Sequence, residues 1–279
     1  MLPDGKSLLA QGLRHARWVM ALGFAASGFL TPAQADEAGM QLAQRVYERA
    51  VGKDSTSVLT MTLTEAGHNP RVRRLITYQR RPKLGELAVL TRFTDPADIA
   101  GTGLLTLDHI SADTDQWIYL PALDRVRRIS ASRKGGRFVN SELYYEDLRE
   151  RKPKQDQHRI LGRETVAGVA CDVLESIPVD TDNSVYLKRV SWIDPTSLLP
   201  LRVDFYEKNL STPSKRILVM KHGKVQGYWA VLDSAVTDLA SGNQTRLVSS
   251  KIIFDRRLPA QLFTTQALED EGAEEEYRP

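Results

Sequence analysis

Alternating apolar and polar positions predict β-strands through most of the chain. Between residues 56 and 64, Leu59, Met61 and Leu63 lie on one side and threonines on the other, which is typical of a strand with one buried face. Similar patterns, punctuated by Gly and Pro, predict further strands at residues 71–81, 86–93, 104–107, 116–120, 125–129, 158–161, 170–179, 185–193, 201–207, 214–221, 228–238 and 245–254. The connections are too short for repeated helical crossovers, so the pattern indicates an antiparallel sandwich or barrel.

Helical spacing is confined to the N-terminal third of the chain. Leu42, Val46 and Ala50 recur every four residues, which predicts an amphipathic helix over residues 40–51 that ends at Gly52. Residues 94–103 begin with Asp-Pro and contain two glycines, which predicts one helical turn before the next strand. The fold class is therefore predicted to be α+β and mostly β.

Residues 115–148 form the most distinctive stretch. An aromatic and β-branched run at 116–120, a proline-containing turn at 121–124 and a basic strand at 125–129 together predict a hairpin. A loop rich in Ser, Arg, Lys and Gly follows at 130–137, and an aromatic and acidic segment comes after it. A polar loop between an apolar hairpin and an aromatic patch favours a moving cover over a catalytic floor.

Basic side chains gather on this same stretch. They are Arg125, Arg127, Arg128, Arg133, Lys134 and Arg137, and the only acidic residue between positions 122 and 140 is Asp124. One interpretation is a solvated strand face followed by a solvated loop. The other is a docking surface for anionic lipid headgroups or for an acidic partner protein.

The first 35 residues carry the pattern of a secretory signal peptide. Three basic residues precede an apolar run of about 13 residues, and Ala-Gln-Ala at 33–35 supplies the small residues of a cleavage site before Asp36. Because a membrane-spanning helix needs about 20 apolar residues, this run predicts a segment that is removed rather than an anchor. No cysteine lies near the cleavage site for acylation, so we expect a mature domain of residues 36–279.

Charge and motif content exclude several classes of function. The formal net charge is only +3 and falls further without the predicted signal peptide, which argues against nucleic-acid binding. A single cysteine, Cys171, permits neither an internal disulfide nor a cysteine-based zinc site. Motifs for phosphate loops, nucleophile elbows and metalloproteases are absent, and nothing singles out a pair of catalytic carboxylates. We therefore expect no catalysis, no metal and no cofactor, and we expect the acidic tail from about residue 267 to be a frayed, solvated end.

The sequence W-I-Y-L-P-A-L-D-R-V-R-R-I-S, followed by G-G-R-F and Y-Y-E-D-L, resembles the outer-membrane lipoprotein-sorting-like proteins. These are periplasmic relatives of the lipoprotein carrier LolA and the receptor LolB. The later runs W-I-D-P-T-S-L-L-P-L-R-V-D-F-Y and H-G-K-V-Q-G-Y-W keep the same order, so the resemblance extends over residues 40–270. It implies a single curved antiparallel sheet, a half-open barrel of about eleven strands. Helical and loop segments near 40–51, 94–103 and 130–148 are expected to plug the open face.

The resemblance also implies a function, which is to bind and transfer a lipid or lipoprotein in the periplasm without catalysis. The concave face of such a sheet shelters acyl chains, whose exposure to water costs about 25 cal/mol per Å². The candidate cavity-lining residues are Leu59, Met61, Leu63, Trp117, Tyr119, Leu201, Val203 and Phe205. The same residues also suit a filled core. In LolA-like carriers an Arg-Pro pair ends an early strand and its arginine controls the lid, and Arg81 occupies the matching position here.

Two other functions remain open at this stage. The first is a periplasmic sensor or accessory subunit that uses this fold to contact an envelope export complex. The second is an enzyme such as a lipid hydrolase, which a panel of ester substrates would detect. For the carrier, the expected partners are acyl chains together with an inner-membrane exporter or an outer-membrane receptor, and the expected state is a monomer.

Overall fold

The structure, a computed structural model, describes residues 32–111 and 113–279, in which thirteen β-strands form one antiparallel sheet of order β6-β5-β4-β3-β2-β1-β13-β12-β11-β10-β9-β8-β7. The strands are β1 Asp54–Thr64, β2 Arg71–Lys83, β3 Glu86–Asp95, β4 Gly103–Leu107, β5 Asp115–Leu120, β6 Arg125–Arg128, β7 Asp156–Val166, β8 Val169–Pro178, β9 Lys188–Ile193, β10 Pro200–Tyr206, β11 Lys215–Val225, β12 Tyr228–Asp238 and β13 Gln244–Phe254. The predicted class is confirmed. The figure of about eleven strands that the resemblance implied is too low, because all thirteen segments of the alternating pattern pair as strands, including the short β4 and β6.

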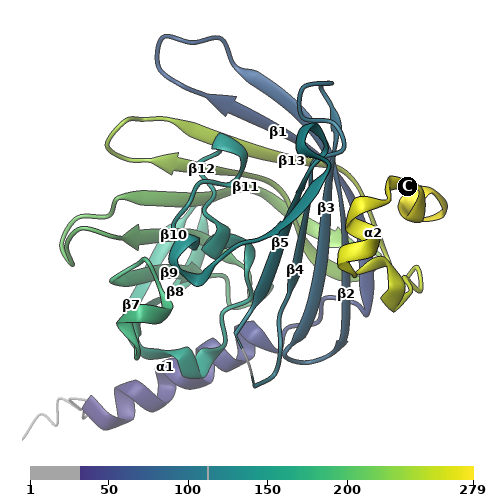
Figure 1. The fold of residues 1–279 in the computed structure, drawn as a ribbon. Helices are drawn as coiled ribbons and strands as arrows, with labels where there is room; N and C mark the ends of the chain where they lie inside the picture. Colours follow the sequence, from purple (N-terminus) through teal and green to yellow (C-terminus); the bar gives the residue numbers. More distant parts are fainter. Residues whose placement is uncertain (1–31, 112) are drawn as a thin grey trace, which may run out of the picture. The chain divides into compact units, whose positions relative to one another are not determined.

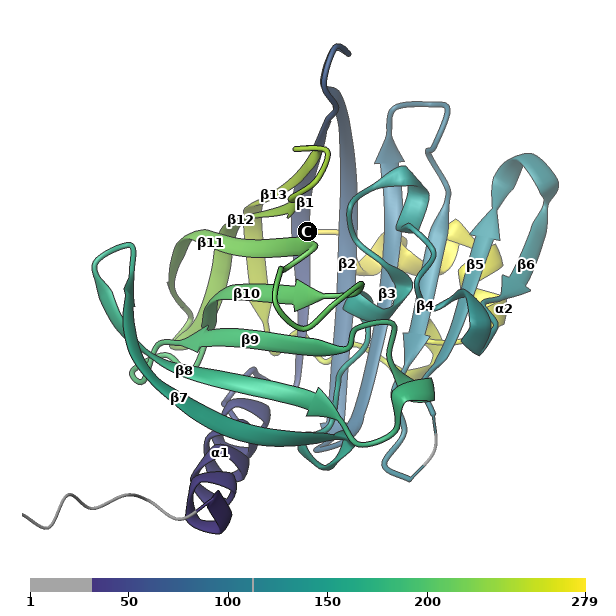
Figure 2. The same cartoon turned by 90° about the vertical axis from the view of Figure 1, so that its left-hand side faces the viewer.

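The sheet is a meander with one long-range pairing. Strands that are neighbours in sequence pair with each other, except β6 and β7, which are the two edges of the sheet. The pairing of β1 with β13 joins the two halves of the chain. The sheet bends strongly, so that β7–β11 run across β2–β5 and the two halves enclose a concave side (Figures 1 and 2). A twisted sheet of this size curls in this way because strand twist accumulates along it.

Helix α1, Pro32–Tyr47, packs on the concave side of the second half of the sheet. Leu42 and Ala43 contact Leu174 of β8 and Ile193 of β9, which explains the helical spacing of its apolar residues. The helix begins and ends earlier than the predicted residues 40–51. After its last residue, the Arg49 side chain donates to the carbonyl of Val46. Most of the predicted signal peptide, residues 1–31, lies outside the described residues.

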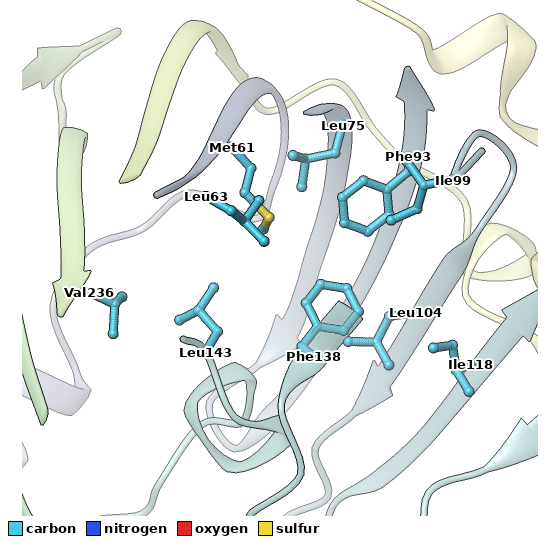
Figure 3. Close-up of a cluster of buried hydrophobic side chains, with 10 residues drawn as sticks. All are labelled: Met61, Leu63, Leu75, Phe93, Ile99, Leu104, Ile118, Phe138, Leu143 and Val236. Atoms are coloured by element: carbon cyan, nitrogen blue, oxygen red, sulfur yellow. The ribbon is translucent and has the colours of Figure 1, made fainter. Parts of the chain in front are cut away.

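Residues 130–148, which we name the cover segment, lie inside the curve of the sheet (Figure 2). The segment contains three short 3-10 helices, η2 Ala131–Arg133, η3 Phe138–Asn140 and η4 Tyr145–Leu148. Phe138 and Leu143 insert into the concave face and pack against an apolar cluster from β1–β5 (Figure 3). The prediction that this segment plugs the open face is therefore confirmed.

The C-terminal segment covers the opposite, outer face of β2–β5. Helix α2, Thr265–Glu269, and the 3-10 helix η8, Glu271–Tyr277, pack there, and Leu268 is fully buried. Glu274 is also fully buried and forms an ion pair of 2.7 Å with buried Arg92 of β3. The expectation of a frayed, solvated tail is therefore wrong. Acidic composition alone did not indicate that one of these carboxylates, Glu274, pairs with the buried Arg92.

Candidate functional site

A cavity of about 510 Å³ lies between α1, the concave face of β8–β11 and the end of the cover segment. Its volume falls within the range of about 300–1,000 Å³ that is typical of small-molecule sites. Part of its wall is apolar and comes from four adjacent strands. These side chains are Leu174, Ile193, Val203, Phe205 and Ile217. They project inward together because alternate residues of a strand share one face.

The remainder of the cavity wall is charged, which differs from the apolar void implied by the resemblance. Residues 146–156 contribute much of this polar wall, together with Arg49, Arg81 and Arg189. Glu150 forms an ion pair with Arg81. Burial raises the pKa of the Glu150 carboxyl above its ordinary value, although the Arg81 guanidinium opposes that shift. The site is thus amphipathic.

A second group of charges surrounds Asp156, whose carboxylate is almost fully buried. Arg151 contacts it at 2.6 Å, and Arg189 of β9 forms a further ion pair with it. Burial lowers the pKa of the Arg189 guanidinium, while Asp156 acts in the opposite direction. Two arginines therefore share one carboxylate in this part of the wall.

The predicted lining residues divide into four groups. Val203 and Phe205 of β10 line the cavity. Leu59, Met61 and Leu63 of β1 lie on the concave face but are covered by the inserted cover segment, so they form packed core. Trp117, Tyr119 and Leu201 do not line the cavity.

Trp117 and Tyr119 lie on the outer face of β5, in the cluster beneath the C-terminal segment. Their neighbour Ile118 is the residue that points to the concave side. The composition of β5 is apolar on both faces, so alternation alone could not reveal which face is concave. Leu201 packs with Val173 and other apolar residues rather than lining the cavity, because the β10–β9 pairing shifts register between Pro200 and Arg202.

Polar contacts hold the cover segment against the sheet at several points. The Lys215 ammonium of β11 donates to Asp147 at 2.6 Å, and the Tyr186 hydroxyl donates to the other oxygen of that carboxylate at 2.6 Å. The backbone N–H of Val185 donates to Glu146 at 2.7 Å. Thr245 of β13 accepts from the backbone N–H of Glu142 at 2.9 Å. The segment is therefore fastened by specific bonds as well as by its apolar insertion.

Arg81 lies at the end of β2, where it reaches the chain just beyond the cover segment. Its side chain is about nine-tenths buried, at 10% exposure, and its ion pair with Glu150 connects β2 to that part of the chain. The structure thus places Arg81 next to the cover segment and in the cavity wall.

A second hollow, a groove of about 800 Å³, lies between the β5–β6 hairpin and the cover segment. Of the six basic residues singled out in the sequence, the groove is lined by Arg125, Arg127, Arg128, Arg133 and Arg137. Lys134 lies apart, and its ammonium donates to the carbonyl of Asp182. Apolar side chains, including Ile118 and Ile129, form the floor.

The charges of this groove are only partly neutralised. Arg128 pairs with Asp115, and Arg137 pairs with Glu142 at 2.7 Å. Arg125, Arg127 and Arg133 are exposed and form no ion pair within residues 32–111 and 113–279. The groove is therefore a cationic surface with an apolar base.

Among the described residues, no group of three or more His, Cys, Asp or Glu side chains is arranged to hold a metal ion. Cys171 is buried, and burial raises the pKa of its thiol. No helix in this part of the chain has the length and apolarity needed to cross a bilayer.

Sequence reasoning missed the charged half of the cavity. The stretch 150–158 has the charged and polar composition typical of a surface loop. Pro153 and His158 are in fact buried, and the stretch forms a wall of the cavity. The one available signal was its position directly after the predicted cover.

Two solved structures resemble most of this chain. A domain described as an outer membrane lipoprotein-sorting protein, from Vibrio parahaemolyticus, is 33% identical, with a TM-score of 0.79 over 84% of this chain and 99% of that chain. A DUF1329 family protein from Desulfovibrio piger is 30% identical, with the same TM-score of 0.79 and the same coverage of 84% and 99%.

A LolA superfamily protein from Nitrosomonas europaea is 18% identical, with a TM-score of 0.64 over 84% of this chain and 99% of that chain, and this likeness concerns the fold alone. A family model described as an uncharacterized protein matches residues 85–270. No curated protein matches the sequence.

Proposed function

The chain belongs to the outer-membrane lipoprotein-sorting-like family, and we propose that it is a periplasmic carrier that shelters an acyl chain and transfers it without catalysis. The observation that carries this proposal is the cavity of about 510 Å³, with its strand-borne apolar wall, at the end of the cover segment. An acyl chain gains about 25 cal/mol for each Å² of its surface removed from water. Val203 and Phe205 supply part of that apolar contact.

Entry of a lipid requires the cover segment or α1 to move, and Arg81 is the residue we propose to control the cover. Its ion pair with Glu150 fixes the chain two residues after η4. In an Arg81→Met variant that contact is lost, so we expect faster exchange of bound lipid and faster proteolysis between residues 130 and 152. Arg80→Met is the matched control, because Arg80 is adjacent on β2 and does not line the cavity.

We propose that the basic groove docks the carrier on an anionic lipid surface. Each unpaired arginine near such a surface contributes about 1 kcal/mol, and Arg125, Arg127 and Arg133 are available for this contact. In this scheme an inner-membrane exporter supplies the lipid, an outer-membrane receptor accepts it, and the carrier acts as a monomer.

Vesicle sedimentation tests the docking proposal. Changing Arg125, Arg127 and Arg133 together to Ala should abolish binding to vesicles that contain phosphatidylglycerol and leave the fold intact. Changing the exposed Lys208, Lys221 and Lys251 to Ala removes the same charge elsewhere on the surface. Equal loss of binding in both triple variants would show a net-charge effect. No vesicle binding by the wild type, with capture of an acidic envelope protein instead, would favour an accessory subunit of an export complex.

The carrier proposal itself is tested on the purified mature protein. Mass spectrometry of an organic extract should reveal a co-purified lipid, and a fluorescent fatty-acid probe should bind and be displaced by unlabelled lipid. Val203→Asp together with Phe205→Asp should abolish probe binding. Absence of both the lipid and the probe signal would exclude a carrier, and turnover of ester substrates would indicate a hydrolase instead.

A further inference from the structure

We propose that the cavity selects an amphiphile with an acidic head group, either a carboxylate or a phosphate monoester, and that Arg49 and Arg81 bind that head. This inference rests on the proposed carrier function and names its ligand class. Arg49 follows the end of α1 and Arg81 ends β2, and both side chains line the cavity beside Glu150.

Three guanidinium nitrogens at this point lack a protein acceptor. They are Nε of Arg49, Nε of Arg81 and Nη1 of Arg81, and all three are shielded from solvent. One acceptor beside them, Oε2 of Glu150, is buried without a donor, so three unpartnered donors accompany one unpartnered acceptor. Arg49 donates from Nη1 to the carbonyl of Val46 at 2.9 Å, and Arg81 donates from Nη2 to Glu150. A buried donor without a partner costs about 1–3 kcal/mol. An anionic oxygen atom placed between the two arginines would remove that cost.

The two guanidinium groups also lie close enough to affect each other. Burial lowers the pKa of Arg49, and the charge of Arg81 lowers it further. Glu150 is the carboxylate that both arginines face, and burial raises its own pKa. Two cations against one carboxylate leave an uncompensated positive charge, which a buried site tolerates poorly without a counter-ion.

The rest of the cavity wall repeats this imbalance. Arg151 and Arg189 share the single carboxylate of Asp156. Of the other two acidic side chains of the wall, Asp147 is paired with Lys215, whereas Glu146 accepts from the neutral groups of Ser184 and Val185 and keeps its charge. Over the whole wall, six Arg and Lys side chains accompany four Asp and Glu side chains. The cavity therefore favours an anion over a neutral or cationic head group.

The apolar wall of the cavity indicates that the ligand also carries a hydrocarbon tail. Leu174, Ile193, Val203, Phe205 and Ile217 form one surface on the strands. Arg49, just after α1, and Arg81 of β2 line another part of the cavity wall. A molecule with a charged head and a hydrocarbon tail can contact both. Inorganic phosphate could satisfy only the arginines, so we expect it to bind much more weakly than an alkyl phosphate.

A direct binding assay of the mature protein with four ligands shows whether the cavity prefers a carboxylate head, a phosphate head, a neutral head or a free anion. The four ligands are a long-chain fatty acid, a monoalkyl phosphate of the same chain length, the corresponding alcohol and inorganic phosphate. We expect the acid or the alkyl phosphate to bind at least about tenfold more tightly than the alcohol, which corresponds to about 1.4 kcal/mol. Whichever of the two binds more tightly identifies the head group as carboxylate or phosphate.

Variants then assign the effect to the arginines. Arg49→Met should lower the affinity for the preferred acidic ligand toward that of the alcohol, since Arg81 remains, and leave the affinity for the alcohol unchanged. Arg45→Met is the matched control, because Arg45 is exposed in the last turn of α1 and does not line the cavity. Arg49→Lys should recover part of the affinity, and a thermal unfolding profile like that of the wild type verifies its fold.

Each outcome supports or overturns the inference separately from the carrier function. Equal affinity of the wild type for acid, alkyl phosphate and alcohol would overturn the inference while the carrier function stands. Binding of inorganic phosphate as tight as that of the alkyl phosphate would show a free-anion site and would also overturn it. Failure of all three chain-bearing ligands to bind would instead refute the carrier function.

Discussion

Lys215 and Asp147 form a buried ion pair of 2.6 Å that joins β11 to the cover segment. The two side chains are 3% and 2% exposed, so water contributes little to the solvation of either charge. The ammonium also lies 3.5 Å from the ring centre of Tyr144 and 4.9 Å from that of Tyr186. Burial lowers the pKa of Lys215, and the Asp147 carboxylate opposes that shift. This contact is therefore an anchor for the cover segment.

Removing the cation of this pair should destabilise the protein strongly. In Lys215→Met the apolar stem remains while Asp147 stays buried without its counter-ion, and breaking such a pair costs about 3–5 kcal/mol. Urea unfolding monitored by tryptophan fluorescence measures this cost. The double variant Lys215→Met with Asp147→Asn is the control, and it should regain part of the stability. A loss below 1 kcal/mol in the single variant would contradict a role for this pair as an anchor.

Phe138 should matter for both stability and lipid entry. Its ring is 2% exposed and lies 5.7 Å from Phe93 and 6.0 Å from Tyr145, measured between ring centres. Phe138→Ala should cost about 3–5 kcal/mol by leaving a cavity on the concave face. The same change should speed uptake of a fluorescent fatty-acid probe, since the cover segment loses its main apolar insertion.

The control for that experiment is Phe138→Leu, which retains most of the apolar volume and should cost much less than truncation to Ala. Stopped-flow fluorescence gives the uptake rate, and urea unfolding gives the stability. An unchanged uptake rate in Phe138→Ala, despite the expected loss of stability, would mean that lipid enters elsewhere, for example beside α1.

The strand pattern was predictable because alternation reports directly on pleating. Every predicted strand segment is present, and most ends agree within a few residues. Alternation identifies which residues share a face but not which face is concave. Trp117 and Tyr119 were misplaced for that reason, since β5 carries apolar residues on both sides.

The cavity was much less predictable. Its two key arginines precede Glu150 by many residues, and no local pattern connects Arg49 and Arg81 with that carboxylate. Phe138, which inserts into the concave face, lies in a loop that has no apolar periodicity, so its burial could not be predicted from a local pattern. Such long-range contacts depend on the curvature of the whole sheet, which no single segment encodes. The basic groove was easier to predict from the sequence, because its arginines lie close together along the chain.

The buried pair of Arg92 and Glu274 predicts that the C-terminal segment contributes to stability. Both side chains are 0% exposed, and Arg92 also donates to the carbonyl of Leu268 at 2.9 Å. Glu274→Gln should therefore cost about 3–5 kcal/mol, because the Arg92 charge stays buried without its partner. Glu275→Gln is the control, since Glu275 is exposed and should change stability by no more than about 0.5 kcal/mol. Equal effects of the two changes in urea unfolding would contradict the structure of this segment.

His158 predicts a dependence of stability on pH near neutrality. Its ring is 6% exposed, with Nε2 2.8 Å from the carbonyl of Pro153 and Nδ1 2.9 Å from the hydroxyl of Ser176. Burial lowers the pKa of His158 below its ordinary value of 6.5, although the hydrogen bond to Pro153 opposes the shift. The unfolded chain therefore takes up a proton at a higher pH than the folded chain does. This contribution to stability is complete above about pH 6.5 and is lost as the pH falls toward the folded-state pKa.

Urea unfolding of the wild type, of His158→Gln and of His68→Gln over about pH 7.5 to 5 isolates this effect. His158→Gln should be less stable at neutral pH, because Gln cannot reproduce both ring contacts, but the stability gap to the wild type should narrow as the pH falls. His68 is exposed, so His68→Gln should parallel the wild type at every pH. The loss should also appear as increased proteolysis of α1, because Gly39 packs directly against the backbone of His158. A constant gap between the wild type and His158→Gln across this range would show that the imidazole binds protons equally in the folded and unfolded chains.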